Sequence, residues 1–132
     1  MKRKVVLVKI DKLKSHEAVN PRRLVNLKRQ IKSDGFLRNP VVVDKKTLVV
    51  LDGHHRMVAL KRMGCQKIAV YLVDYENNDV RVYLRRKKLR IKLLKEIVIK
   101  RAIEGRNLPF KTTRHLLSYR PREIRMKIKK LL

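Results

Sequence analysis

Short apolar runs that alternate with polar turns predict a small β-sheet. The runs occupy residues 5–10, 41–43, 48–51, 68–73 and 80–84. Apolar runs of this length, rich in Val and Ile and bounded by turn residues, are typical of β-strands. The polar sequence Asp-Lys-Lys-Thr separates the second run from the third, so we expect these two strands to form a hairpin.

Other segments repeat their apolar residues at the spacing of an α-helix. In the first, Asn20 and Pro21 suit the N-cap and the first turn, and Gly35 suits the end. A second helix is expected over residues 55–63 and a third over residues 94–102. These elements predict an α+β fold in which helices flank a small mixed sheet.

The chain is expected to form one domain. Its 132 residues and 44% hydrophobic content allow a single core, and no repeat or linker divides residues 1–132. A basic amphipathic segment beginning at Pro121 is read as a further helix near the C-terminus.

The charge balance indicates an anionic partner. The chain has 37 Lys and Arg against 11 Asp and Glu, a formal net charge of +26. Such an excess favours nucleic acid, nucleotide phosphates or an acidic membrane surface. Charge-rich surfaces are also common in thermophilic proteins, but those usually balance the two signs.

Cysteine content and hydropathy exclude several classes. The single cysteine, Cys65, rules out an intramolecular disulfide and a cysteine-rich zinc site, and it is expected to be a small buried residue. No apolar run approaches the roughly 20 residues of a membrane span. The apolar run before Lys9 is too short for a signal peptide. We therefore expect a cytoplasmic protein without a membrane partner.

The most informative stretch of the sequence is residues 48–60, where an apolar strand meets Asp52-Gly53 and then His54-His55-Arg56. A strand, a glycine turn and a helix start bring backbone N–H groups beside basic side chains, a geometry that favours phosphate. Asp52 is placed to hold a metal or a hydroxyl group. The alternative is an ordinary turn followed by the solvated face of a helix.

Adjacent histidines argue against zinc and leave magnesium as the better candidate. His54 and His55 would diverge on a helix, so they could not easily bind one zinc ion. Mg²⁺ is commonly held by one carboxylate together with substrate phosphates.

Two other polar clusters adjoin predicted strand or helix ends, where functional sites are often built. One is Ser15-His16-Glu17, and the other is Lys111-Thr112-Thr113-Arg114-His115. Each also has an ordinary interpretation, as a solvated loop with a helix-capping serine or as a helix N-cap with its neighbours.

The stretch from Val50 to Arg56, followed by Ala59-Leu60 and Gly64, resembles the signature of the ParB/sulfiredoxin fold, a superfamily that includes ParB-like nucleases. Within it the chain is most similar to the archaeal free L-serine kinases. Three pieces match that family in order: residues 14–17, residues 52–56 and residues 111–115. Residues 80–83 match as well.

Sister families fit less well. Sulfiredoxins have a reactive cysteine where this chain has His54, so sulfinic-acid repair is not expected. ParB partition proteins bind CTP and also contain a DNA-binding helix-turn-helix domain, for which this chain has little room. Compared with the related kinases, the chain lacks a long insert after Tyr83 and a tryptophan, so the acceptor could differ from serine.

The resemblance implies roles for the matching residues. Glu17 corresponds to the general base, and Asp52 to a second carboxylate that orients the hydroxyl group or Mg²⁺. Phosphate oxygens would be held by Gly53, His54, His55 and Arg56. Substrate would be closed in by Thr112, Thr113, Arg114 and His115, with residues 106–132 completing the site.

The reaction implied by the resemblance is phosphorylation of free L-serine to O-phospho-L-serine, with ATP or ADP as donor; the sequence does not choose between them. The alternative is a ParB-like DNA-binding or nucleotide-binding module, motivated by the basic stretches at residues 85–92 and 120–130. A nuclease fits less well, because Asp52 and Glu17 are few ligands for two-metal chemistry.

Overall fold

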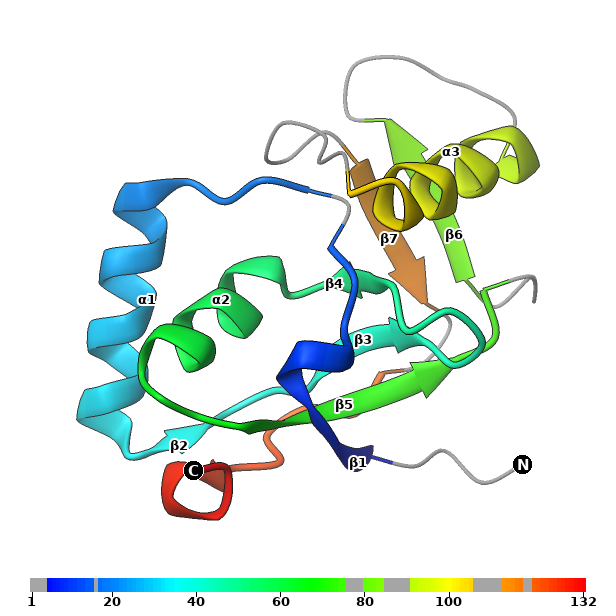
Figure 1. The fold of residues 1–132 in the computed structure, drawn as a ribbon. Helices are drawn as coiled ribbons and strands as arrows, with labels where there is room; N and C mark the ends of the chain where they lie inside the picture. The colour runs from blue at the N-terminus through cyan, green and yellow to red at the C-terminus, as the bar shows by residue number, and fades with distance from the viewer. Residues whose placement is uncertain (1–4, 16, 76–79, 85–90, 106–112, 118–119) are drawn as a thin grey trace.

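A computed structural model describes residues 5–15, 17–75, 80–84, 91–105, 113–117 and 120–132, with only the backbone for residues 80–84, 91–93, 113–114 and 116 (Figure 1). The central sheet has the order β1-β5-β3-β4. Its strands are β1 (Val5–Lys9), β5 (Lys67–Val73), β3 (Val41–Asp44) and β4 (Val50–Asp52). β3 runs parallel to β5, and the other two pairings are antiparallel. The predicted mixed sheet and the predicted hairpin, β3–β4, are confirmed.

Helices cover both faces of this sheet. Alternate side chains of β3 divide between two cores: Val41 and Val43 join one, and Val42 joins the other. The first core contains the buried faces of α1 (Pro21–Asp34) and α2 (His54–Arg62). The second contains α3 (Ile91–Ile103). The two-residue period of a strand therefore produces a three-layer domain.

The helix boundaries follow the local sequence signals. Asn20 caps α1, with its side-chain oxygen 3.0 Å from the Arg22 backbone nitrogen, and Gly35 ends the helix in the left-handed region. α2 begins at His54, one residue before the predicted start, because Gly53 serves as its N-cap. The predictions for these two helices are confirmed to within one residue.

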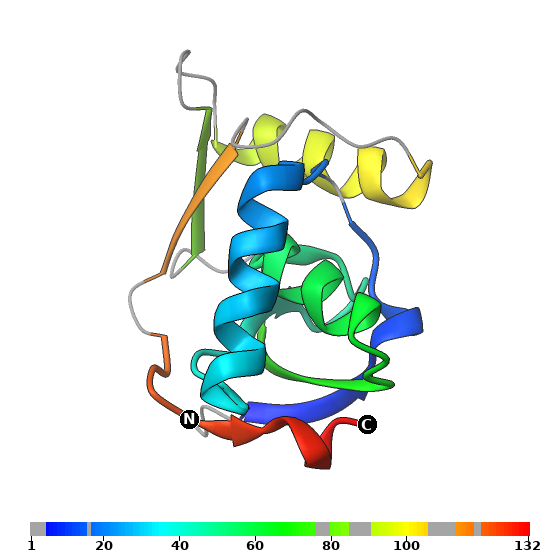
Figure 2. The same ribbon diagram turned by 90° about the vertical axis from the view of Figure 1, so that its left-hand side faces the viewer.

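Two small antiparallel strand pairs complete the described fold. β6 (Val80–Leu84) pairs with β7 (Thr113–Leu117) and stands apart from the central sheet, beside α3 (Figures 1 and 2). β2 (Phe36–Leu37) pairs with β8 (Met126–Lys127) close to the C-terminus. Among the described helices, none is long and apolar enough to cross a membrane.

The prediction of a C-terminal helix after Pro121 is wrong. Residues 120–125 have no helical structure, β8 follows, and a short 3₁₀ turn (Ile128–Lys130) comes last. Ile124, Met126 and Ile128 pack against the first core. Glu123 and Arg125 have φ values of 55° and 47°, in the left-handed region, which a right-handed helix does not contain. We call residues 120–132 the C-terminal strap.

Candidate active site

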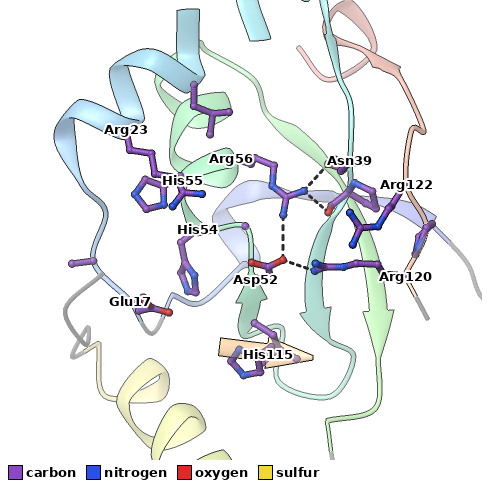
Figure 3. Close-up of a pocket in the computed structure, with 16 residues that line it drawn as sticks. Glu17, Arg23, Asn39, Asp52, His54, His55, Arg56, His115, Arg120 and Arg122 are labelled. Carbon is purple, nitrogen blue, oxygen red and sulfur yellow. Dashed lines mark hydrogen bonds and ion pairs between the residues drawn. The ribbon is translucent and has the colours of Figure 1, made fainter. Parts of the chain in front are cut away.

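A cavity of about 540 Å³ lies where several parts of the chain converge. Figure 3 shows its labelled side chains gathered from the segment before α1, α1 itself, the segment between β2 and β3, the β4–α2 junction, β7 and the C-terminal strap. The lining residues used below are Glu17, Arg23, Asn39, Asp52, Gly53, His54, His55, Arg56, His115, Arg120 and Arg122. Of the sequence-predicted residues, Glu17, the stretch 52–56 and His115 are therefore brought together.

Gly53 shapes the junction between β4 and α2. Its φ of 99° lies in the left-handed region, and a Cβ atom there would come within 2.9 Å of Arg56 Nη2 and 3.0 Å of Val41 Cγ2. Both facts require glycine. Buried Met57 and Leu60 hold the helix that starts after it. Because Gly53, His54 and His55 line the cavity, the positive end of the α2 dipole lies at the cavity.

We expect Gly53→Ala to destabilise the protein and to weaken phosphate binding. The left-handed backbone alone costs an alanine about 1–3 kcal/mol, and the close contacts add to that. Gly64→Ala is the matched control, because Gly64 has a φ of 85° but a Cβ atom added to it would meet no neighbouring atom within 4 Å. Urea denaturation should show the larger loss for Gly53→Ala; equal losses would mean that close approach at Gly53 is unimportant.

Asp52 lies at the centre of the charged cluster. Its Oδ2 atom is 3.5 Å from Arg56 Nη2 and accepts a hydrogen bond from Arg120 Nη2. Burial alone would raise the pKa of Asp52, but the charges of Arg56 and Arg120 outweigh burial and hold that pKa below its ordinary value. The carboxylate is therefore ionised at neutral pH.

Arg56 contributes positive charge to the site and is also anchored to the backbone before β3. Its Nη1 atom donates to the backbone oxygens of Asn39 at 3.2 Å and Pro40 at 2.9 Å. Burial lowers the pKa of Arg56, and the positive charges of Arg120, Arg23 and Arg122 act in the same direction, against the opposing charge of Asp52. The crowding of these cations indicates a site suited to a polyanion.

Glu17 is buried on the opposite side of the cavity from Arg120, beside His54 (Figure 3). The segment before it is fixed against β4, since Lys14 and Leu48 are joined by a backbone hydrogen bond of 2.9 Å, and Val50 and Lys14 by one of 2.7 Å. Ser15 does not cap a helix; its Oγ atom donates to the Glu17 carbonyl at 2.9 Å. These contacts set where the Glu17 side chain enters the cavity.

His55 joins the starts of α1 and α2. The Asn20 backbone N–H donates to His55 Nε2 at 2.9 Å, so Nε2 has no proton and the ring proton is on Nδ1. In this arrangement the imidazole is neutral. A phosphate at the start of α2 would then be held through backbone N–H groups and the arginines, with His55 as a spacer between helices.

His115 reaches the cavity from β7. Its Nε2 atom lies 2.8 Å from the Tyr75 hydroxyl, and both side chains are buried. Burial and the nearby Asp44 raise the pKa of Tyr75, so its hydroxyl stays protonated. Of the other predicted substrate residues, Thr113 and Arg114 lie in β7, where only their backbone is described, and Thr112 lies outside the described residues.

The donor set is compatible with magnesium through the carboxylate of Asp52. No group of three or more His, Cys, Asp or Glu residues is suitably placed in the described part of the chain. Both ion pairs of Asp52 use Oδ2, so Oδ1 could contribute one ligand. One carboxylate oxygen completed by phosphate oxygens and water is an arrangement that Mg²⁺ accepts.

Several lining residues could not be identified from the sequence. Arg122 was expected on a helix, Arg120 lies just before that predicted helix, and Arg23 and Asn39 belong to no recognised motif. The one local signal is the Arg-Pro-Arg sequence at residues 120–122, which does not by itself distinguish a site residue from a solvated one.

Comparison with known proteins assigns the chain to a family. A family model described as the ParB N-terminal domain matches residues 1–87, which is more than half of the chain. The chain belongs to the ParB N-terminal domain family. The ParB-like fold predicted from the stretch around Asp52 and Gly53 is thereby confirmed.

Curated relatives of this ParB-family chain include serine kinases. An ATP-dependent L-serine kinase from Staphylothermus marinus is 37% identical over 83 residues, covering 58% of this chain and 32% of that protein. An ADP-dependent L-serine kinase from Thermococcus kodakarensis is 28% identical over 82 residues, covering 59% of this chain and 34% of that protein. The chain thus spans about a third of the length of these relatives.

Solved structures share the fold of this ParB-family chain. A free serine kinase in complex with AMP matches with a TM-score of 0.84 and 18% identity, over 100% of this chain and 95% of that chain. C-terminally truncated SbnI from Staphylococcus aureus matches with a TM-score of 0.75 and 18% identity, over 96% of this chain and 88% of that chain. At such identities the match establishes a common fold.

Proposed function

We propose that this protein transfers the terminal phosphoryl group of ATP or ADP to the hydroxyl of free L-serine. The observation that supports this most strongly is the composition of one cavity: a buried carboxylate, Glu17, shares it with the start of α2 and the cluster around Asp52. Phosphoryl transfer needs a base for the acceptor and fixed positive charge for the phosphates.

Each half of the site has a role in this reaction. Glu17 accepts the proton of the serine hydroxyl as its oxygen attacks the terminal phosphorus and the bond to the leaving phosphate breaks. The N–H groups at the start of α2 and the surrounding arginines stabilise the charge on the phosphate oxygens. Asp52 would be the protein ligand of a bound Mg²⁺, which would supply further neutralisation of phosphate charge.

The acceptor side of the site includes His115. Its position between Tyr75 and the cavity lets it orient the acceptor, alongside the predicted contributions of Thr112, Thr113 and Arg114. Serine is the acceptor named for the relatives, and the cavity volume of about 540 Å³ is in the range of small-ligand sites.

The direct experiment is to incubate the purified chain with L-serine, Mg²⁺ and either ATP or ADP, and to measure phosphoserine and the product nucleotide. We expect phosphoserine in equal amount to ADP from ATP, or to AMP from ADP. Glycerol and threonine are matched alternative acceptors. Nucleotide hydrolysis without phosphoserine, or no turnover with either donor, would contradict the proposal.

Nucleic acid is a second candidate partner, because of the charge of +26 and the exposed basic side chains on α1 and the C-terminal strap, among them Arg22, Arg29, Lys127 and Lys129. Binding through phosphates alone weakens steeply with salt. Tight, sequence-dependent binding that persists at moderate salt would favour a DNA-binding module over the kinase.

A further inference from the structure

Arg120 is the residue through which the C-terminal strap reaches the site. It lies outside the stretch 52–56, yet its guanidinium group hydrogen-bonds Asp52 Oδ2 in the cavity (Figure 3). Its side chain is 26% exposed and that of Asp52 is 40% exposed, so a ligand can reach both. Among the described residues, Asp52 is the acid with which Arg120 pairs.

The strap does not depend on this ion pair for its position. The Ile124 N–H donates to the Arg38 carbonyl at 2.8 Å, and the Glu123 N–H donates to Asn39 Oδ1 at 2.9 Å. At its far end Leu131 is fully buried, and its carbonyl accepts from the N–H groups of Gln66 and Lys67. The Arg120 side chain can therefore change partner while its backbone stays in place.

The two arginines on Asp52 differ in how firmly they are held. Arg56 also donates to two backbone carbonyls, at 3.2 Å and 2.9 Å, so it stays where it is when Asp52 changes partner. Arg120 has no such second anchor within the described part of the chain. A terminal phosphate has more negative charge than a carboxylate and accepts two parallel N–H bonds from one guanidinium group.

We propose that Arg120 exchanges Asp52 for the terminal phosphate of the bound nucleotide. In the empty site it neutralises Asp52; in the loaded site it stabilises the phosphoryl group in transfer and leaves Asp52 available to the acceptor or to Mg²⁺. This inference rests on the proposed function for its reaction, but the binding of a terminal phosphate can be tested separately. Arg120 forms and breaks no covalent bond.

Arg120→Lys and Arg125→Lys form a matched pair of variants on the same strap. Lysine preserves the charge opposite Asp52 but cannot donate two parallel bonds to a phosphate. We expect Arg120→Lys to lower kcat about 100-fold, since loss of a charge-stabilising donor in such reactions costs roughly that much or more, with a smaller change in KM for serine. Arg125, whose pairing with Glu123 lies on the surface, should tolerate lysine with less than twofold change.

Binding of AMP, ADP and ATP, measured by calorimetry, gives a readout that does not depend on turnover. Arg120→Lys should keep the parental affinity for AMP and lose at least fivefold in affinity for the nucleotide whose terminal phosphate Arg120 contacts. Circular dichroism checks the fold, and Arg120→Gln serves as the second variant if the lysine variant does not fold.

The outcomes separate the two proposals. If the parent phosphorylates serine and Arg120→Lys retains kcat within threefold, Arg120 is structural and the inference is wrong. If the parent makes no phosphoserine, the proposed function fails; a selective loss of ADP or ATP affinity in Arg120→Lys would still support the phosphate contact. Equal losses for all three nucleotides would overturn it.

Discussion

Replacing Glu17 with glutamine should reduce serine phosphorylation by about a thousandfold, within the range expected for loss of a general base. Glutamine keeps the size of the buried side chain but cannot accept the proton of the serine hydroxyl. Glu17 lies away from Arg56, Arg120 and Arg122 (Figure 3). The affinity for nucleotide should therefore stay close to that of the parent. Glu17→Ala should behave in the same way.

The test is a comparison of steady-state rates with nucleotide affinities for the purified variants. Glu96→Gln is the matched control, because Glu96 is an exposed residue of α3 that does not line the cavity. Phosphorylation of serine by Glu17→Gln at the parental rate would mean that another group is the base.

Replacing Asp52 with asparagine should lower turnover by about 100-fold while strengthening the binding of nucleotide phosphates. In the proposed reaction the carboxylate orients the acceptor or Mg²⁺, so its loss should slow the reaction. It also competes with phosphate for Arg56 and Arg120, so its neutralisation leaves more positive charge for the ligand. A lower turnover together with a higher nucleotide affinity would distinguish this role from structural damage, which lowers both turnover and affinity.

Rates and nucleotide affinities of Asp52→Asn should be measured beside Asp11→Asn, whose parent residue forms a surface ion pair with Lys61. A rate within threefold of the parent would contradict the assignment of Asp52.

The low pKa of Asp52 also sets the pH dependence of its contribution. Its folded-state pKa is held below the ordinary value of 3.8, so its ion pairs stabilise the folded protein fully above about pH 5. This stabilisation is lost as the pH falls through the lower folded-state pKa. The difference in unfolding free energy between the parent and Asp52→Asn should therefore be constant from about pH 5 upward and shrink in stronger acid.

Local sequence was sufficient for most of the secondary structure. Asn20, Pro21 and Gly35 mark the ends of α1, and the spacing of Val41–Val43 and Val50–Leu51 predicts strands that pair as the hairpin observed. These features act over a few residues, through caps, turns and side-chain period, so they can be read without knowledge of distant contacts.

The C-terminal strap shows where such reasoning stops. The spacing of its basic and apolar residues predicts an amphipathic helix. In the structure, however, Leu131 is buried in the first core and β8 pairs with β2. Those partners lie far away in the sequence, and their combined burial and hydrogen bonding outweigh helix propensity. The local sequence of the strap therefore could not predict its extended pairing with β2.

For the site, the sequence by itself predicted the residues of the phosphate half: the turn at Gly53, the helix start after it and Asp52 beside it, whereas Glu17 was singled out only through the family resemblance. Their chemistry follows from residue type and from the strand–glycine–helix order. Tertiary structure alone decided that Glu17, His115 and Arg120 meet at that turn, that His55 is neutral because it accepts from the Asn20 N–H, and that Arg56 is anchored on two carbonyls. These are contacts between segments far apart in the chain, and they depend on how two cores pack against one sheet.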